Sequence, residues 1–317
     1  MLSCTSLIAA TTEMITDFSG QKTQVTHQTE TLKNVKLHVV TAGPIDGEPV
    51  ILLHGYPDFW YGWKNQIVAL AKAGYQVIAP DMRGYNKSEK PKHIKDYNID
   101  KVVADILELS EKLHPGEKVN LVGHDWGAII SWYTVYKKPA KFKRLFIFNV
   151  PHPGQINEVF TKPFLYKKQV FSMSWYIWFF HIPILPEFIG KRLLGYEKSF
   201  KQVFTSTMVH KEMITDADKD RYIKAWRQKS AARSSINYYR ANFIKMIRQA
   251  PPVWNFKLPV FFTFGMQDSA LQAELYVETI GKYVPGVHVY KIPDSSHFVQ
   301  LDTPKKVNDI LLKGLLY

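Results

Sequence analysis

Short apolar runs alternate with longer amphipathic segments along this chain. Seven of the runs have the length and composition of strands, namely Val35–Ala42, Val50–Leu53, Tyr75–Ala79, Val119–Val122, Leu145–Val150, Val260–Phe264 and Val287–Ile292. Apolar residues recur at helical spacing in Ile99–Leu113, and a second helix candidate, Gly127–Tyr136, directly follows a strand. Strands that alternate with helices predict an α/β fold with a mostly parallel sheet and helices on both faces.

The strand pattern stops between Pro151 and about residue 249. This part of the chain is helical in pattern and rich in Phe, Tyr and Trp, and a strand pattern resumes at Val260. We therefore predict a core formed by residues 1–151 and 246–317, with a helical cap of residues 152–245 inserted in it. A cap that follows a strand should lie over the carboxyl ends of the strands, where ligands bind in such sheets, and act as a lid.

The most apolar stretch, Phe171–Gly190, is long enough to raise the question of a membrane span. His181, Pro183, Pro186 and Glu187 interrupt it, and its aromatic content is high. The lining of a buried pocket is therefore the preferred interpretation, and no integral membrane span is expected. A cap helix that dips into a membrane surface stays open as an alternative.

Composition limits the class of protein. The chain has 317 residues, with 46% hydrophobic and 22% charged residues, as in globular proteins. Its formal net charge is +13, but the lysines are scattered, so a basic solvated surface is favoured over a nucleic-acid site. Cys4 is the single cysteine, which excludes an intramolecular disulfide.

The N-terminus has an apolar patch but no basic start, so a cleaved signal peptide is not expected. A cytoplasmic location is the default expectation. Neither the role of about the first 30 residues nor the oligomeric state follows from the sequence.

The strongest local motif is Gly123-His124-Asp125-Trp126-Gly127, which follows a predicted strand and leads into a predicted helix. It has the small-x-nucleophile-x-small form of a tight strand-to-helix turn, with Asp125 in place of the usual serine. A carboxylate is ionised at neutral pH and forms an ester with an alkyl carbon. The motif thus favours displacement at saturated carbon, whereas the alternative is a surface turn with Asp125 as a helix N-cap.

A second motif, His54-Gly55-Tyr56-Pro57, follows the strand Val50–Leu53. A loop here can direct the backbone N–H of Tyr56 at a developing oxyanion, and the N–H of Trp126 is the expected second donor. By itself this motif would be interpreted as an ordinary turn at the end of a strand.

Two further strand ends carry an acid and a base. Asp268 follows the strand Val260–Phe264, and His297 follows Val287–Ile292, 29 residues after Asp268 (297 minus 268). The chain order of Asp125, acid and histidine is that of a hydrolase, in which His297 takes a proton from water and Asp268 orients it. The end of the strand Leu145–Val150 could also hold the acid, but it carries Asn149, which cannot be charged.

The sequence has no close set of His, Asp and Glu with ligand spacing, so neither a metal nor another cofactor is expected. The histidines other than His297 are expected on the surface, in the core or in a pocket wall.

Together these motifs resemble those of the α/β-hydrolase-fold epoxide hydrolases. The resemblance extends from about Val35 to the end of the chain, and it is carried by His54–Pro57, Asp81–Pro91 (DMRGYNKSEKP), Gly123–Ala128 (GHDWGA), Asp268 and His297. It implies an enzyme that converts lipophilic epoxides to vicinal diols through an alkyl ester on Asp125. The haloalkane dehalogenases share the GHDWG motif, which leaves them as the alternative.

The resemblance also implies two cap tyrosines whose hydroxyls hold and protonate the epoxide oxygen. The segment Ser174–Phe180 resembles the first tyrosine segment and points to Tyr176, and Ile236–Arg240 resembles the second and points to Tyr239. Tyr238 is the alternative if the register is shifted by one residue. Both tyrosines could instead be cap-core aromatics. The substrate pocket is expected to be lined by Trp126, His54, Pro57, Trp175 and Phe179.

Two rival functions remain at this stage. A haloalkane dehalogenase needs halide donors, for which Trp126 and either Trp175 or Trp178 are available, although Tyr56 stands where such enzymes often carry Asn. Fluoroacetate-type dehalogenases typically carry Arg where Trp126 stands. The second rival is a non-catalytic binding protein of the same fold, which is disfavoured because the chain keeps every member of the catalytic set.

Overall fold

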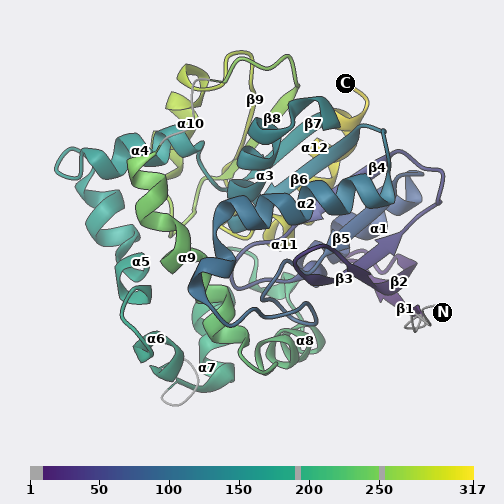
Figure 1. Cartoon of the computed structure of the whole chain (residues 1–317), viewed down its shortest axis with the longest axis horizontal. Coiled ribbons are helices and arrows are strands. Elements are labelled where there is room, and N and C mark those ends of the chain that lie inside the picture. The colour runs from purple at the N-terminus through teal and green to yellow at the C-terminus, as the bar shows by residue number, and fades with distance from the viewer. Residues whose placement is uncertain (1–9, 190–193, 250–253) are drawn as a thin grey trace.

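The computed structural model describes residues 10–189, 194–249 and 254–317. Cys4, Gly190 and the first nine residues of the expected core lie outside them. Figure 1 shows a twisted sheet with helices packed against it and a group of helices at one side. Among the described residues, no helix is both long and apolar enough to cross a membrane.

The sheet has nine strands in the order β1-β2-β3-β5-β4-β6-β7-β8-β9. Their bounds are β1 Thr11–Thr16, β2 Lys22–Thr31, β3 Lys36–Ala42, β4 Pro49–Leu53, β5 Gln76–Pro80, β6 Val119–His124, β7 Phe142–Phe148, β8 Val260–Gly265 and β9 His288–Ile292. The pairs β1–β2, β2–β3 and β3–β5 are antiparallel. The pairs β5–β4, β4–β6, β6–β7, β7–β8 and β8–β9 are parallel. The predicted α/β fold with a mostly parallel sheet is confirmed.

All seven predicted strands are present, and β1 and β2 were not predicted. These two strands are rich in Thr and bury only a few side chains, because β1 forms one edge of the sheet and β2 lies next to it. β7 ends earlier than predicted, at Phe148, since Asn149 has a φ of +47° and leaves the extended conformation.

Helices cover both faces of the sheet. On one face lie α2 Ile99–Leu113, α3 Trp126–Lys137 and α10 Ala273–Thr279, and on the other lie α1 Lys64–Lys72, α11 Val299–Asp302 and α12 Pro304–Leu315. Side chains alternate between the two cores as a pleated strand requires: Ile51 of β4 packs in the first core and Leu52 in the second. The middle strands are apolar on both faces for this reason.

The region between β7 and β8 is helical in the described residues. It contains α4 Pro153–Thr161, α5 Trp175–Phe180, α6 Leu185–Phe188, α7 Gly195–Phe200, α8 Asp216–Trp226 and α9 Ala231–Arg248, with π-helical turns at Lys168–Met173 and Lys201–Thr205. α9 packs against α4, α5 and α8 and so organises the cap. Because α9 runs to Arg248, this helical region passes the expected end of the cap at residue 245.

Candidate active site

Asp125 occupies a tight turn between β6 and α3. Its φ of +50° and ψ of −125° are rare for a residue with a side chain. The flanking glycines are required by contact: a Cβ on Gly123 would lie 2.6 Å from the carbonyl oxygen of Gly127, and one on Gly127 would lie 2.1 Å from that of Leu53. Close packing at both neighbours therefore holds Asp125 in this conformation.

The loop after β4 lies directly against Asp125. The backbone N–H of Tyr56 donates to Oδ1 of Asp125 at 2.6 Å, and a Cβ on Gly55 would lie 2.3 Å from the Cβ of Asp125. The Tyr56 N–H can therefore stabilise negative charge on this carboxylate or on an oxyanion derived from it. Trp126 is the first residue of α3, next to Asp125, and the donor role of its N–H stays a prediction.

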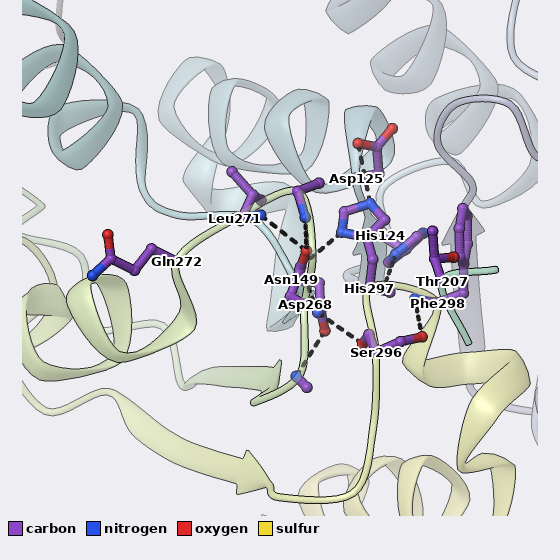
Figure 2. A network of polar contacts seen from close by, with 12 residues as sticks. His124, Asp125, Asn149, Thr207, Asp268, Leu271, Gln272, Ser296, His297 and Phe298 are labelled. Carbon is purple, nitrogen blue, oxygen red and sulfur yellow. Dashed lines mark hydrogen bonds and ion pairs between the residues drawn. The ribbon is translucent and has the colours of Figure 1, made fainter. Parts of the chain in front are cut away.

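The predicted acid and base meet at Asp125 (Figure 2). Nδ1 of His297 lies 2.7 Å from Oδ2 of Asp268, and Nε2 of His297 lies 3.5 Å from Oδ2 of Asp125. The imidazole thus bridges two carboxylates that are 143 residues apart in the chain (268 minus 125). Ala270 and Leu271 donate their backbone N–H groups to Oδ1 of Asp268, which fixes the acid in turn.

The charges around His297 are unusual for a buried histidine. Burial lowers the pKa of His297, but the negative charge of Asp268, its hydrogen bonds and the charge of Asp125 outweigh burial and raise that pKa to about 10. Burial likewise opposes ionisation of Asp125, yet the contacts with His297 and the Tyr56 N–H hold its pKa below the ordinary value. Both shifts favour a carboxylate on Asp125 beside an imidazolium on His297.

Asn149 supports this pair of charges and was not recognised from the sequence. Its Nδ2 donates to Oδ2 of Asp268 at 2.9 Å and to the carbonyl oxygen of Ser296, and its Oδ1 accepts from the N–H of Gly265. Asn149 stands at the alternative position for the acid, and its side chain holds Asp268, which is the acid of this site. Its position at the end of a strand was the available signal.

A cavity opens beside Asp125 under the cap. Tyr176 from α5 and Tyr239 from α9 both line it, together with Asp125 and Trp126. The rings of Tyr176 and Tyr239 lie 6.0 Å apart, and Tyr239 packs edge-on against Trp126. Burial and the charge of Asp125 raise the pKa of both phenols, so both carry their protons at neutral pH and can donate them in hydrogen bonds.

The neighbouring Tyr238 has a different role. It is buried, its hydroxyl donates to the carbonyl oxygen of Arg83 at 2.8 Å, and it does not line the cavity. The register that points to Tyr239 is therefore favoured over its alternative.

The residues expected in the pocket wall are distributed more widely than the sequence suggested. Trp126 lines the cavity, whereas Pro57 lines an adjoining cavity. His54 is fully buried, and its Nε2 accepts from the N–H of Met82. Phe179 is half-buried away from both linings, and Trp175 lies on the outer surface with 56% of its area exposed.

A buried polar network behind His297 was also missed. Nε2 of Gln300 contacts Oδ2 of Asp58 at 3.3 Å and Nδ1 of His124 at 3.2 Å, and Nε2 of His124 lies 2.8 Å from the carbonyl oxygen of His297. Burial, followed by the charge of His297, lowers the pKa of His124 to about 3, so His124 is neutral. Burial raises the pKa of Asp58 to about 7. No sequence motif marks this chain of contacts, because its members come from different elements.

The cap is tied to the loop that carries Asp268. The side-chain amide of Gln169 donates to the carbonyl oxygen of Ala270 and accepts from the N–H of Gln272. Gln169 also donates to Ser174, just before α5 and Tyr176. The part of the chain that the structure describes contains no cluster of three or more His, Cys, Asp or Glu residues placed to hold a metal ion.

Known proteins of similar sequence identify the family of this chain. Residues 48–304 match the family model described as alpha/beta hydrolase fold. The chain is 37% identical over 281 residues to the AB hydrolase superfamily protein YfhM of Bacillus subtilis, covering 89% of this chain and 94% of that protein. It is 33% identical over 291 residues to Epoxide hydrolase 1 of Caenorhabditis elegans, covering 90% of this chain and 69% of the relative.

Solved structures give the same result. A mutant of an epoxide hydrolase from Bacillus megaterium, in complex with its naphthyloxy-propane-1,2-diol product, aligns with a TM-score of 0.78 and 28% identity. The alignment covers 92% of this chain and all of that one. The chain therefore belongs to the α/β-hydrolase family. Within that family it is similar to epoxide hydrolases over most of its length.

Proposed function

We propose that this protein is an epoxide hydrolase that converts lipophilic epoxides to vicinal diols without a cofactor. The observation that carries the proposal is the shared cavity: the Asp125 carboxylate and the protonated phenols of Tyr176 and Tyr239 line the same space. Opening an epoxide requires a nucleophile at carbon and a proton donor at oxygen, and this cavity offers both. Its other lining residues are mainly apolar, which suits a lipophilic substrate.

In the first step the Asp125 carboxylate attacks an epoxide carbon. A new C–O bond forms to Asp125 while the bond between that carbon and the epoxide oxygen breaks. The oxygen leaves as an alkoxide, and Tyr176 and Tyr239 hold it and supply its proton. The product of this step is a hydroxyalkyl ester of Asp125.

In the second step water hydrolyses the ester. Esterification removes the charge of Asp125, one of the two carboxylates that raise the pKa of His297, so the imidazolium more readily loses its proton. That proton replaces the one that the tyrosines supplied in the first step. His297, oriented by Asp268, then takes a proton from water, and the hydroxide attacks the ester carbonyl. The N–H groups of Tyr56 and Trp126 stabilise the tetrahedral oxyanion. Its collapse breaks the bond between the Asp125 carbonyl carbon and the alkyl oxygen, and this oxygen takes the proton of the new Asp125 carboxyl, which gives the diol and restores the Asp125 carboxylate.

The dehalogenase alternative lacks support from the cap. Neither Trp175 nor Trp178 lines the cavity beside Asp125, and both are exposed on the outer surface, so neither is placed as a second halide donor. A non-catalytic binding protein would also have a cavity, but it would not require an imidazole 3.5 Å from Asp125 and 2.7 Å from Asp268.

A parallel assay of styrene oxide and a bromoalkane tests the reaction class. We expect diol from styrene oxide and no bromide release. The variant Tyr176→Phe/Tyr239→Phe should lose epoxide opening by about 100-fold or more, since it removes the proton donors. Bromide release without diol formation would reject the proposal, as would full activity of the double variant. Tight binding of the epoxide without turnover would instead support a binding protein.

A further inference from the structure

The helical segment that carries Tyr176 is apolar on two opposite sides. Its inner side contains Val170 and Ile177, which are buried against the rest of the protein. Its outer side contains Phe164, Phe171, Trp175, Trp178 and Ile182, which are all exposed and separated by steps of seven, four, three and four residues. The segment is not one regular helix, because a π-helical stretch precedes α5, but the rings of Phe164 and Phe171 lie 6.4 Å apart and all five residues face away from the protein interior. A helix with apolar residues all round is normally covered on every side.

The apolar surface continues past this segment. Ile184, Leu185 and Phe188, in and beside α6, are also exposed, as is Leu165 next to Phe164. In Figure 1 α4, α5 and α6 follow one another along the edge of the molecule, and α9 lies between them and the sheet. We call these nine exposed residues the outer cap face: Phe164, Leu165, Phe171, Trp175, Trp178, Ile182, Ile184, Leu185 and Phe188. Monomeric proteins rarely expose apolar side chains together in this number without a partner for them.

The charges beside the outer cap face select the partner. Residues 162–189 include one carboxylate, Glu187, and its charge is neutralised by a two-pronged ion pair with Arg240. Lys167 and Lys168 are exposed and have no ion pair among the described residues. The surface thus combines tryptophans, other apolar side chains and free cations with no unpaired anion. This combination is typical of protein surfaces that lie in the interface of an anionic bilayer.

We propose that the outer cap face binds the surface of an anionic lipid bilayer. The tryptophans and phenylalanines would enter the headgroup region, and Lys167 and Lys168 would contact anionic headgroups. The inner side of the same segment bears Tyr176 and Ile177, which line the cavity beside Asp125. A lipophilic epoxide dissolved in the bilayer would then be close to the site, and this last step rests on the proposed function.

The test is sedimentation of the purified full chain with vesicles of phosphatidylcholine and phosphatidylglycerol at low salt. We expect the protein to bind these vesicles and to bind pure phosphatidylcholine much less. Phe164→Gln/Phe171→Gln removes two exposed apolar side chains from the outer cap face and should weaken partitioning by about tenfold or more. Met14→Gln/Ile45→Gln removes two exposed apolar side chains from elsewhere and should leave partitioning unchanged.

The lysines test the electrostatic part. Lys167→Ser/Lys168→Ser should weaken binding to the anionic vesicles by about tenfold at low salt, and the difference should shrink at high salt. Failure of the wild-type protein to bind anionic vesicles would overturn the proposal, as would equal binding by wild type and Phe164→Gln/Phe171→Gln. Sedimentation velocity without lipid adds a third criterion. A dimer that this apolar variant converts to a monomer would show that a second copy covers the face.

Lipid binding and hydrolysis are measured separately, so the two proposals can fail independently. Styrene oxide in lipid-free buffer should be hydrolysed at the same rate by wild type and by Phe164→Gln/Phe171→Gln, because neither phenylalanine lines the cavity. Vesicle binding without hydrolysis of any epoxide would leave the lipid surface standing and reject the enzyme. Hydrolysis without vesicle binding would do the reverse.

Discussion

At the scale of single residues, the site depends on three side chains whose charges are coupled. In the proposed mechanism His297 acts only on the ester. His297→Gln should therefore still form the ester and then release product at least about 1000-fold more slowly. Mass spectrometry of the Asp125 peptide after a single addition of styrene oxide should show the added mass of the epoxide. Normal turnover by this variant would contradict the role of His297.

Asp58 gives a prediction for the pH dependence of stability. Burial raises its pKa from 3.8 in the unfolded chain to about 7 in the folded protein, so the folded state holds this proton more tightly. The stabilisation from this group is complete below pH 3.8 and is lost as the pH rises through about 7. Asp58→Asn cannot ionise and should not show this loss. The free energy of unfolding in urea should be measured at about pH 5 and about pH 8. Between these two pH values the wild type should lose more stability than Asp58→Asn.

The residues of the site differ in whether the sequence predicts their roles. Asp125, Asp268 and His297 were predictable because each follows a strand and their chain order is that of a hydrolase, and the structure brings them together. Asn149 and Asp58 were not recognised: Asn149 follows a strand but belongs to no motif, and the partners that define both roles lie more than 100 residues away in the chain. A contact of that kind leaves no spacing to detect.

At the scale of elements, Arg240 joins the two cap helices that carry the tyrosines. From α9 its guanidinium donates to Glu187, to the carbonyl oxygen of Phe180 at the end of α5 and to that of Ile182 just beyond it. Arg240→Lys keeps the charge but loses this fork of donors. The position of Tyr176 relative to Tyr239 should then relax, and formation of the ester should slow by about ten- to a hundredfold.

Pre-steady-state kinetics can separate the two chemical steps of this variant. Hydrolysis of the ester should be unchanged, because His297, Asp268 and the Tyr56 loop lie on the core. Arg233→Lys, at an exposed position on the same helix, is the matched control and should change neither step. Equal slowing of both steps by Arg240→Lys would indicate a general loss of structure instead.

Apolar patterns in the sequence suffice to predict the bounds of some elements and not of others. α2 has the bounds that its helical spacing predicts, and the buried strands β4, β6 and β8 start within a residue of prediction. Strands β1 and β2 lack such runs, since an edge strand buries only a few side chains and is polar elsewhere. Their pairing with β3 is decided by the rest of the sheet.

At the scale of the whole molecule, the unpredicted hairpin of β1 and β2 contributes to the hydrophobic core on the α1 face of the sheet. Ile15 of β1 is 2% exposed and packs in the core beneath α1, whereas Met14, which points to the opposite side of the strand, is 56% exposed. Ile15→Ala should lower the free energy of unfolding by about 2–4 kcal/mol, and Met14→Ala by less than about 0.5 kcal/mol. Chemical denaturation measures both. Equal small losses would show that the hairpin is peripheral to the fold.

The sequence by itself determined the fold class, the inserted helical region and the three residues of the candidate catalytic set. These features depend on local periodicity and on which residues follow each strand, and both are written in the chain order. Only the tertiary structure decided which cap aromatics face the cavity, because an all-apolar helix gives no sign of its inner and outer sides. It placed Tyr176 and Tyr239 beside Asp125 and left Trp175 and Trp178 on the outer cap face.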